Sequence, residues 1–356
     1  MGATDAAHPG RAVPLAVCGQ SVRGCGRRDS RVGNELTYRE VVVGNERSAS
    51  AEVDVFGCRP TTWRETGDEL GDAVDDLDGK VGVVTGAASG IGRSLALAFA
   101  AEGVRLVLAD IESDPLEAVA SELRATGADV FAVTADVSDA GDVERIGIAA
   151  DDVFGALHLA CNNAGVGGGG LSWEIDLETW RWVLGVNLFG VIHGIHSFVP
   201  RIIASGGGHV INTASMAGLT SNPGMGPYNA SKHAVVTISE SLALELAMVH
   251  PEVGVTVLCP GWVRTQINRS DRNRPGVSAG EVGLGGESGS LSRMLDHLIE
   301  TGMDPDDVAA LVVDAIQTRK FAILTHPDWS DAVSARIDRL LVGELPEFRL
   351  PGTLTD

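Results

Sequence analysis

The chain has 356 residues, 44% of them hydrophobic, which is enough for one large domain of about 250 residues with extra segments, or for two ordinary domains. Its formal net charge of −21 argues against a protein that wraps nucleic acid or lies on an anionic membrane, because both partners would repel it. No run of about 18 apolar residues predicts a membrane span, and the N-terminus lacks a signal-peptide pattern. We therefore expect a soluble, cytoplasmic protein whose partner is a small molecule.

Residues 1–76 show no sustained helical or strand period, apart from a short strand-like run at 40–43. They are interpreted as an extension of low order that ends in an acidic linker. A natural start near Val74, which would leave the extension untranslated, is the alternative. Its cysteines, Cys18, Cys25 and Cys58, form no CxxC pair and no zinc spacing, so we predict no metal site.

From Lys80 onward, short apolar runs alternate with helical patterns. Such alternation predicts a parallel, doubly wound, Rossmann-like sheet with helices on both faces, in a single domain over residues 77–345 and before a tail at 346–356. Two of the runs contain Cys161 and Cys259, which we expect to be reduced and structural. The expected strands are 81–84, 104–109, 130–133, 157–161, 210–211, 255–258 and 321–324.

The segment 266–303 interrupts this alternation with Gly, Ser, Arg and Asp. We interpret it as a flap over a substrate, although a surface insertion without function would have the same composition. A helix should follow to about Thr318, with Asp304 as its N-cap and Pro305 in its first position. A last helix is expected at 331–341.

A glycine-rich loop directly follows the first expected strand and opens a helix, in the order that phosphate binding requires. Gly86 would permit a tight turn, Gly90 would let the backbone approach a pyrophosphate, and Gly92 would let the helix pack against the strand. The cofactor-binding residues expected here are Gly86, Ser89, Gly90, Ile91 and Gly92.

Asp110 ends the second expected strand, where a carboxylate can hydrogen-bond both hydroxyls of an adenosine ribose. The same charge would repel a 2′-phosphate, so NAD is favoured as the cofactor and NADP remains possible. Arg93 could partly offset the repulsion. The structural alternative is that Asp110 merely starts a loop.

Tyr228 and Lys232 lie four residues apart in a helical stretch and therefore share one face. The chain holds two tyrosines and the lysines Lys80, Lys232 and Lys320, so chance alone would rarely produce this spacing. An ammonium group favours a nearby phenolate, which should lower the pKa of Tyr228. The tyrosine could then exchange a proton with an alcohol or carbonyl oxygen while a hydride moves at carbon.

With these motifs in place, the chain resembles the short-chain dehydrogenase/reductase family over about residues 77–341. The resemblance rests on short motifs in a specific order. They are the TGxxxGxG loop at 85–92, Asp136-Val137, Asn162-Asn163-Ala164-Gly165, Asn187, Ser215, the YxxxK pair, and Pro260-Gly261 with Val263 and Thr265.

The resemblance implies a role for each position. Asp136 and Val137 would contact the adenine, Asn163, Ala164 and Gly165 would support the cofactor, and Pro260, Gly261, Val263 and Thr265 would surround the nicotinamide. Ser215 would bond the substrate oxygen, and Asn187 would bend a helix and hold a water that relays protons. Lys232 would also bind the nicotinamide ribose. The family commonly forms tetramers, and the apolar stripe Val235, Ile238, Leu242 and Leu246 fits such an interface or a core equally well.

We therefore predict an alcohol dehydrogenase or ketone reductase whose catalytic residues are Asn187, Ser215, Tyr228 and Lys232. Met216, the 222–227 loop, Trp262 and the flap are expected to enclose a hydrophobic secondary alcohol or ketone, with Ser215 and Tyr228 bonding its oxygen. A nucleotide-sugar epimerase or dehydratase is an alternative, disfavoured by the spacing of the glycine loop. A non-catalytic dinucleotide-binding regulator is another, although none of the four catalytic residues is missing.

Overall fold

The computed structural model describes residues 76–276 and 296–346. Three predicted segments lie outside the described residues: the extension at 1–75, the middle of the flap at 277–295, and the tail at 347–356. The domain boundaries drawn there stay predictions.

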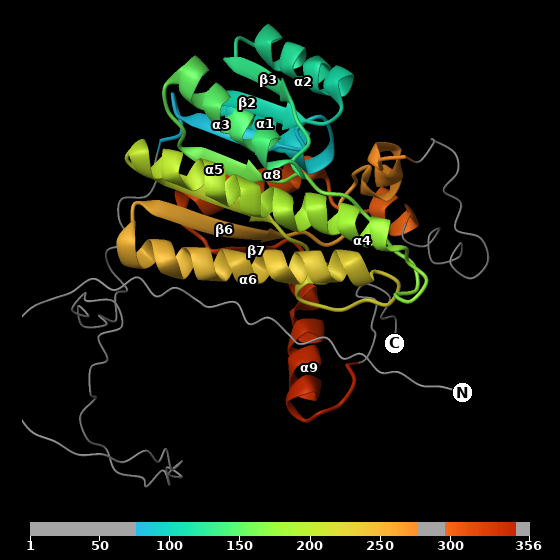
Figure 1. Cartoon of the computed structure of the whole chain (residues 1–356). Coiled ribbons are helices and arrows are strands. Elements are labelled where there is room, and N and C mark those ends of the chain that lie inside the picture. Colours follow the sequence, from blue (N-terminus) through green and yellow to red (C-terminus); the bar gives the residue numbers. More distant parts are fainter. Residues whose placement is uncertain (1–75, 277–295, 347–356) are drawn as a thin grey trace, which may run out of the picture. The chain divides into compact units, whose positions relative to one another are not determined.

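Seven parallel strands form one sheet in the order β3-β2-β1-β4-β5-β6-β7 (Figure 1). The order reverses between β1 and β4, so the chain crosses from one half of the sheet to the other beside β1. This confirms the predicted doubly wound fold. The bounds are β1 (Val81–Thr85), β2 (Arg105–Asp110), β3 (Val130–Thr134), β4 (Leu159–Asn162), β5 (Gly208–Thr213), β6 (Val253–Cys259) and β7 (Ala322–Leu324).

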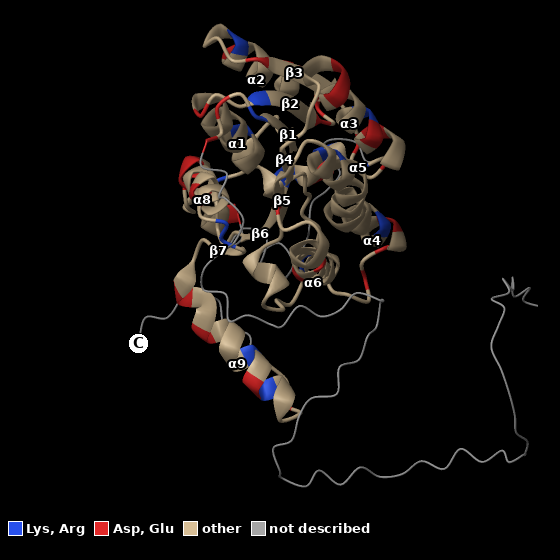
Figure 2. Cartoon of the chain, turned by 90° about the vertical axis from the view of Figure 1, so that its left-hand side faces the viewer, with Lys and Arg blue, Asp and Glu red and all other residues tan. Residues whose placement is uncertain are grey.

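Helices cover both faces of the sheet, as can be seen in Figure 2, where the view runs almost along the strands. Helices α1, α2 and α8 lie on one face, and α3, α5 and α6 on the other. The bounds are α1 (Gly90–Ala101), α2 (Ser113–Ala125), α3 (Ala140–Phe154), α4 (Leu177–Leu184), α5 (Gly190–Ala204), α6 (Gly226–Val249), α8 (Pro305–Gln317) and α9 (Ser330–Leu341).

Each face of the sheet has its own hydrophobic core. Phe99 of α1 packs with the inner residues of α2 and α8 on one face, and Phe198 and Ile202 of α5 pack with those of α3 on the other. Strand β1 contributes to both cores, and all five of its residues are buried. A strand covered on both faces must be apolar throughout, which is why its sequence shows no alternation.

Several local predictions agree with the structure. Asp304 caps α8, where its carboxylate accepts a hydrogen bond of 3.1 Å from the amide of Asp306. Cys161 and Cys259 are buried in β4 and β6 as free thiols. Helix α9 follows its predicted range but buries none of its residues, and it extends away from the sheet (Figure 1).

The expectation that no segment could span a membrane needs correction. Among the described residues, the continuous helix Leu177–Ala204 is long and apolar enough by length and composition to do so. It consists of α4, a π-helical turn at Gly185–Phe189, and α5. Because α5 buries Phe198 and Ile202 against the sheet, core packing accounts for this apolar composition.

The apolar stripe on α6 faces the core. Three of its four residues, Val235, Leu242 and Leu246, are buried within the chain, where they pack against the sheet and its neighbours, whereas Ile238 is half-buried. The large apolar side chains that α6 exposes are instead Leu244, Met248 and Val249. The stripe therefore stabilises this fold and gives no evidence for an interface.

Candidate functional site

One pocket lies at the carboxyl ends of the strands, beside the point where the strand order reverses. Ligands of doubly wound sheets bind at this position, because the loops that follow the strands diverge there. All of the predicted site residues line this pocket except Asn187 and Met216. The tertiary structure thus brings together positions that span residues 86 to 265.

The glycine loop has the backbone geometry that its sequence predicts. Gly86 and Gly90 have φ angles of 68° and 53°, in the left-handed region that favours glycine. A Cβ at Gly92 would lie 2.0 Å from the carbonyl oxygen of Gly86, so only glycine fits there. The loop leads into the N-terminus of α1, where free amides and the helix dipole favour an anion.

Thr85 fastens the glycine loop to the loop that follows β4. Its hydroxyl oxygen accepts hydrogen bonds from the amides of Asn163 (2.9 Å) and Ala164 (3.1 Å), and its hydroxyl donates to the carbonyl of Cys161. Asn163 returns a bond of 3.0 Å from its Nδ2 to the carbonyl of Thr85. This reciprocal bonding fixes the floor of the pocket.

Asp110 reaches back from the end of β2 to the glycine loop. Its carboxylate accepts a bond of 2.9 Å from the amide of Ala88 and one of 3.0 Å from the amide of Glu112. Burial raises the pKa of Asp110, and these amide bonds oppose that rise. The carboxylate is therefore held in a fixed place on the pocket wall; the bond to Glu112, two residues on, is one that a residue starting a loop also makes.

Arg93 is not directed at Asp110. Its Nη2 bonds both carboxylate oxygens of Glu122 on α2, at 2.7 Å each. Its charge is therefore already engaged by another carboxylate.

Asp136 and Val137 line the pocket beyond Asp110. The carboxylate of Asp136 accepts bonds from the amide and the hydroxyl of Ser138, at 2.9 and 2.7 Å. The amide of Asp136 donates to Asp142 at 2.9 Å, so the turn after β3 is held by its own side chains.

The loop after β6 forms the opposite wall. The amide of Gly261 donates to the hydroxyl of Thr325 at 3.0 Å, which fixes the course of the loop beside Pro260 and Val263. A Cβ at Gly90 would lie 3.0 Å from Cγ2 of Thr265. Thr265 therefore faces the glycine loop across the pocket.

Ser215, Tyr228 and Lys232 meet at the inner end of the pocket. Ser215 directly follows Thr213-Ala214 at the end of β5, whereas Tyr228 and Lys232 lie one turn apart near the start of α6. The hydroxyl of Ser215 donates to the carbonyl of Pro260 at 3.2 Å, and Nζ of Lys232 lies 5.7 Å from the centre of the tyrosine ring. The helical spacing seen in the sequence thus places both side chains on the pocket side.

The electrostatics of this cluster differ from the prediction. Burial raises the pKa of Tyr228, and the neighbouring Ser215 side chain only partly opposes this rise, so the expected lowering is wrong for this structure. The ammonium of Lys232 donates to the carbonyl of Thr213 at 2.8 Å and does not offset the burial of the phenol. Burial lowers the pKa of Lys232 itself to about 8.

Asn187 lies behind the pocket, fully buried in the π-helical turn between α4 and α5. Its side chain exchanges two hydrogen bonds with the backbone of Val166, at 2.8 and 3.0 Å, and donates to the hydroxyl of Ser231. A Cβ at Gly165 would lie 3.4 Å from Oδ1 of Asn187 and 3.6 Å from Nζ of Lys232, so both polar groups flank this glycine.

Met216 does not fit its predicted role as a substrate contact. It is fully buried in a core cluster with Val235 and Cys259, and it is absent from the pocket lining. The turn after Ser215 directs its side chain toward the core. Trp262 does line the pocket, and its ring meets that of Trp329 edge to face, with centroids 5.8 Å apart.

Several residues that line the pocket were not predicted from the sequence. Thr213 accepts from Lys232 through its backbone, so its side-chain type gave no signal. Trp182 and Trp329 line the pocket but lie far from the motifs in the sequence. Glu112 and Arg272 form an ion pair at its outer end; the position of Glu112 two residues after Asp110 was a signal, and Arg272 lies in the segment predicted as a flap, although nothing local indicated its pairing.

The comparisons with known proteins agree with this geometry. The model of the short chain dehydrogenase family matches residues 80–276. A 1-deoxy-11-beta-hydroxypentalenate dehydrogenase of Streptomyces exfoliatus is 39% identical over 255 residues, covering 71% of this chain and 85% of that protein. A cyclohexanol dehydrogenase of an Acinetobacter species is 34% identical, with 68% and 97% covered.

Among solved structures, a short-chain dehydrogenase/reductase from Burkholderia phymatum in complex with NAD has 42% sequence identity and a TM-score of 0.74. The match covers 77% of this chain and 99% of that one. Since fold, pocket and sequence agree over the whole catalytic unit, the chain belongs to the short-chain dehydrogenase/reductase family of oxidoreductases.

Proposed function

We propose that the protein interconverts a secondary alcohol and a ketone on a hydrophobic small molecule, with NAD favoured over NADP as the hydride carrier. One observation carries this proposal: Ser215, Tyr228 and Lys232 meet in the same pocket as the glycine loop and Asp110. The NAD complex of the related Burkholderia structure supports it.

The residues present fit a dinucleotide. The missing side chains at Gly86, Gly90 and Gly92 leave a cradle at the N-terminus of α1, suited to a pyrophosphate. Asp110 would hold the adenosine ribose, and Asp136 with Val137 would contact the adenine. Asn163, Ala164 and Gly165 would support the nucleotide from below, and Thr265 with its neighbours would surround the nicotinamide.

A bound nicotinamide would exchange a hydride with the substrate carbon. Tyr228 would exchange the proton with the substrate oxygen, and Ser215 would donate a hydrogen bond to that oxygen. Ser215 suits this role because its oxygen accepts from the amide of Ala217 at 3.1 Å, and its hydroxyl, which donates to the carbonyl of Pro260 at 3.2 Å, would rotate to donate to a bound substrate oxygen.

Lys232 would hold the nicotinamide ribose and take part in proton transfer. With a pKa of about 8, its amine is mostly protonated at neutral pH and keeps a neutral fraction of roughly one in ten, so it can both give and take a proton. Asn187 would act without touching the substrate. Its hydrogen bonds would hold the loop at Val166 and the helix at Ser231 in place around Lys232.

The surroundings of this cluster indicate an apolar substrate. The pocket is lined there by Trp182, Met225, Trp262, Ile267 and Trp329, and the cationic side chains in its described lining are Lys232 and Arg272. Cyclohexanol, named for one relative, is a cyclic alcohol. A cyclic, terpenoid or steroid-like alcohol is the substrate class that we favour.

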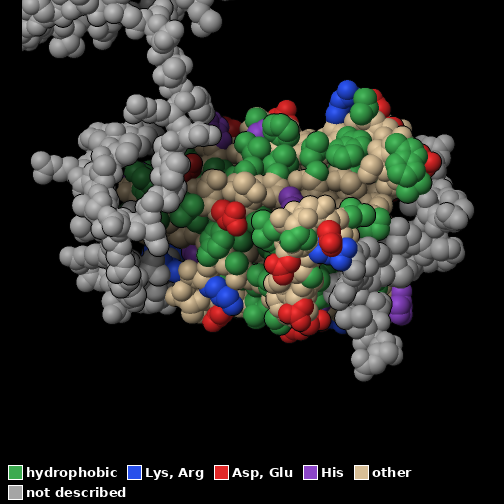
Figure 3. Space-filling view, turned by 90° about the horizontal axis from the view of Figure 1, so that it is seen from below, with side chains coloured by type: hydrophobic (Ala, Val, Ile, Leu, Met, Phe, Trp, Pro, Cys, Tyr) green, Lys and Arg blue, Asp and Glu red, His purple; other side chains and the backbone are tan. Residues whose placement is uncertain are grey.

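We also propose that the chain is cytoplasmic and forms homo-oligomers. Large apolar side chains are exposed on α6 and on α9, among them Met248, Val249 and Leu341. Figure 3 shows hydrophobic side chains across the face that these two helices form. Light scattering of the purified chain tests this part, and a monomer at micromolar concentration would refute it.

The central test combines a substrate panel with one substitution. Alcohols and ketones are screened with NAD(H) and NADP(H) by following the absorbance of the reduced cofactor. Tyr228→Phe should lower kcat by orders of magnitude and leave the Kd for NAD within a few-fold, because it removes a single oxygen. Near-normal turnover of Tyr228→Phe would refute the mechanism. NAD binding without any turnover by the wild type would favour the regulator.

A further inference from the structure

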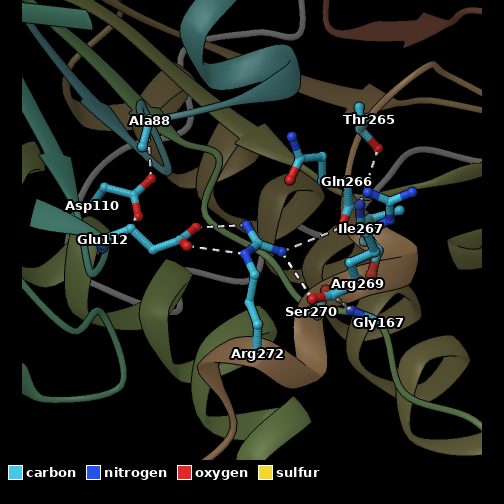
Figure 4. Close-up of polar contacts among 10 residues, drawn as sticks. All are labelled: Ala88, Asp110, Glu112, Gly167, Thr265, Gln266, Ile267, Arg269, Ser270 and Arg272. Carbon is cyan, nitrogen blue, oxygen red and sulfur yellow. Dashed lines mark hydrogen bonds and ion pairs between the residues drawn. The ribbon is translucent and has the colours of Figure 1, made fainter. Parts of the chain in front are cut away.

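Glu112 and Arg272 form an ion pair at the outer end of the pocket, close to Asp110 (Figure 4). Nε of Arg272 donates to Oε1 of Glu112 at 3.0 Å, and Nη2 donates to Oε2 at 2.6 Å. This is the two-pronged geometry in which a guanidinium binds a carboxylate or a phosphate. The pair is partly exposed, with 24% of the Glu112 side chain and 30% of the Arg272 side chain open to solvent.

The order of the three charges matters. Figure 4 shows the carboxylate of Glu112 between Asp110 and the guanidinium of Arg272. The amide of Glu112 is itself bonded to Asp110, and the bond with Arg272 lowers the pKa of Glu112, so its charge persists. A group bound next to Asp110 would therefore meet the carboxylates of both Asp110 and Glu112. The nearby guanidinium of Arg272 is already paired with Glu112.

Arg272 would keep its place without Glu112. Its Nη1 donates to the carbonyl of Arg269 at 2.9 Å and to that of Gln266 at 3.4 Å. The surrounding segment Ile267–Asn273 is tied to the far wall by Ser270, whose hydroxyl accepts from the amide of Gly167 at 3.0 Å. Removing Glu112 would thus free two donors, Nε and Nη2, on a guanidinium that is already positioned.

Among the described residues that line the pocket, only Lys232 and Arg272 are cationic, and Lys232 lies at the catalytic end. Arg93, the basic residue near the glycine loop, is paired with Glu122 and does not line the pocket. A phosphate on the adenosine ribose would therefore find Arg272 as its partner.

We propose that Glu112 is a second determinant of cofactor choice, which acts by holding the Arg272 guanidinium away from a 2′-phosphate; this rests on the proposed binding of a dinucleotide. Asp110 repels the 2′-phosphate, and Glu112 engages Arg272, the arginine that lines the pocket among the described residues. Loss of Asp110 alone then leaves NADP poorly bound, whereas loss of both carboxylates turns Arg272 into a phosphate receptor.

Calorimetric titration with NAD⁺ and NADP⁺ tests this, since the two differ only in the 2′-phosphate. Asp110→Ser should change the Kd for NADP⁺ by a few-fold at most. Asp110→Ser/Glu112→Ser should tighten NADP⁺ binding a further tenfold to hundredfold, roughly the worth of a charge-assisted bidentate bond. Adding Arg272→Met should abolish this gain, and adding Arg93→Met, the matched control, should keep it.

The outcomes separate the two proposals. If the wild type binds neither dinucleotide, the proposed function fails. If the wild type binds NAD⁺ but Asp110→Ser alone gives the full gain, or the gain survives Arg272→Met, the role of Glu112 is refuted. Thermal unfolding of each variant confirms that a missing gain does not arise from an unfolded protein.

Discussion

Replacing Gly92 by alanine tests the geometry of the glycine loop directly. The added Cβ would lie 2.0 Å from the carbonyl oxygen of Gly86 and 2.7 Å from Nδ2 of Asn163. Non-bonded carbon and oxygen atoms need more than about 3 Å, so the helix and the turn must separate by roughly 1 Å. The obstructing atom belongs to the backbone, which cannot move aside by rotating a side chain.

The expected loss follows from this displacement. Overpacking in a rigid site costs about 1–3 kcal/mol, and the higher helix propensity of alanine returns up to about 1 kcal/mol. We therefore expect the free energy of unfolding to fall by about 1–2 kcal/mol. NAD should also bind at least tenfold more weakly, because the amides at the start of α1 move away from the pyrophosphate.

Urea denaturation and titration with NAD measure both effects. Gly185→Ala is the matched control, because its Cβ would meet nothing closer than Cβ of Ser138 at 3.4 Å and its φ of −56° is helical. The control should be as stable as the wild type or slightly more so. If Gly92→Ala matched Gly185→Ala in both stability and NAD affinity, the close-packing argument would be wrong.

Two further changes probe the interior of the site. Thr85→Val should destabilise the protein by about 1–3 kcal/mol in urea, because the partly buried amides of Asn163 and Ala164 lose their acceptor; Thr85→Ser should restore most of the loss, and a neutral Thr85→Val would contradict the role of the hydroxyl. Lys232 has a pKa of about 8 when folded and near 10.5 when unfolded, so the unfolded chain binds more protons between these values and stability should rise with pH. From pH 7 to pH 9 the wild type should gain about 1 kcal/mol relative to Lys232→Met, and equal slopes in the two proteins would refute a lowered pKa.

The sequence alone determined the features that depend on local chemistry. Apolar runs between helical patterns predicted the parallel sheet, since strands buried on both faces must be apolar along their whole length. Asp304 and Pro305 located the start of α8, because capping involves neighbours in the chain. The spacing of Tyr228 and Lys232 likewise placed both on one side of α6.

The tertiary structure decided everything that depends on which distant groups meet. The stripe on α6 could have faced an interface or a core, and only packing showed that it faces the core. Met216 follows Ser215 in the chain, yet its side chain enters the core. The pKa of Tyr228 rises because the fold buries its phenol, which no local pattern in the sequence records. The pair Glu112–Arg272 joins residues 160 positions apart, and no local pattern records such a contact, because a hydrogen bond depends on distance in space and not on distance along the chain.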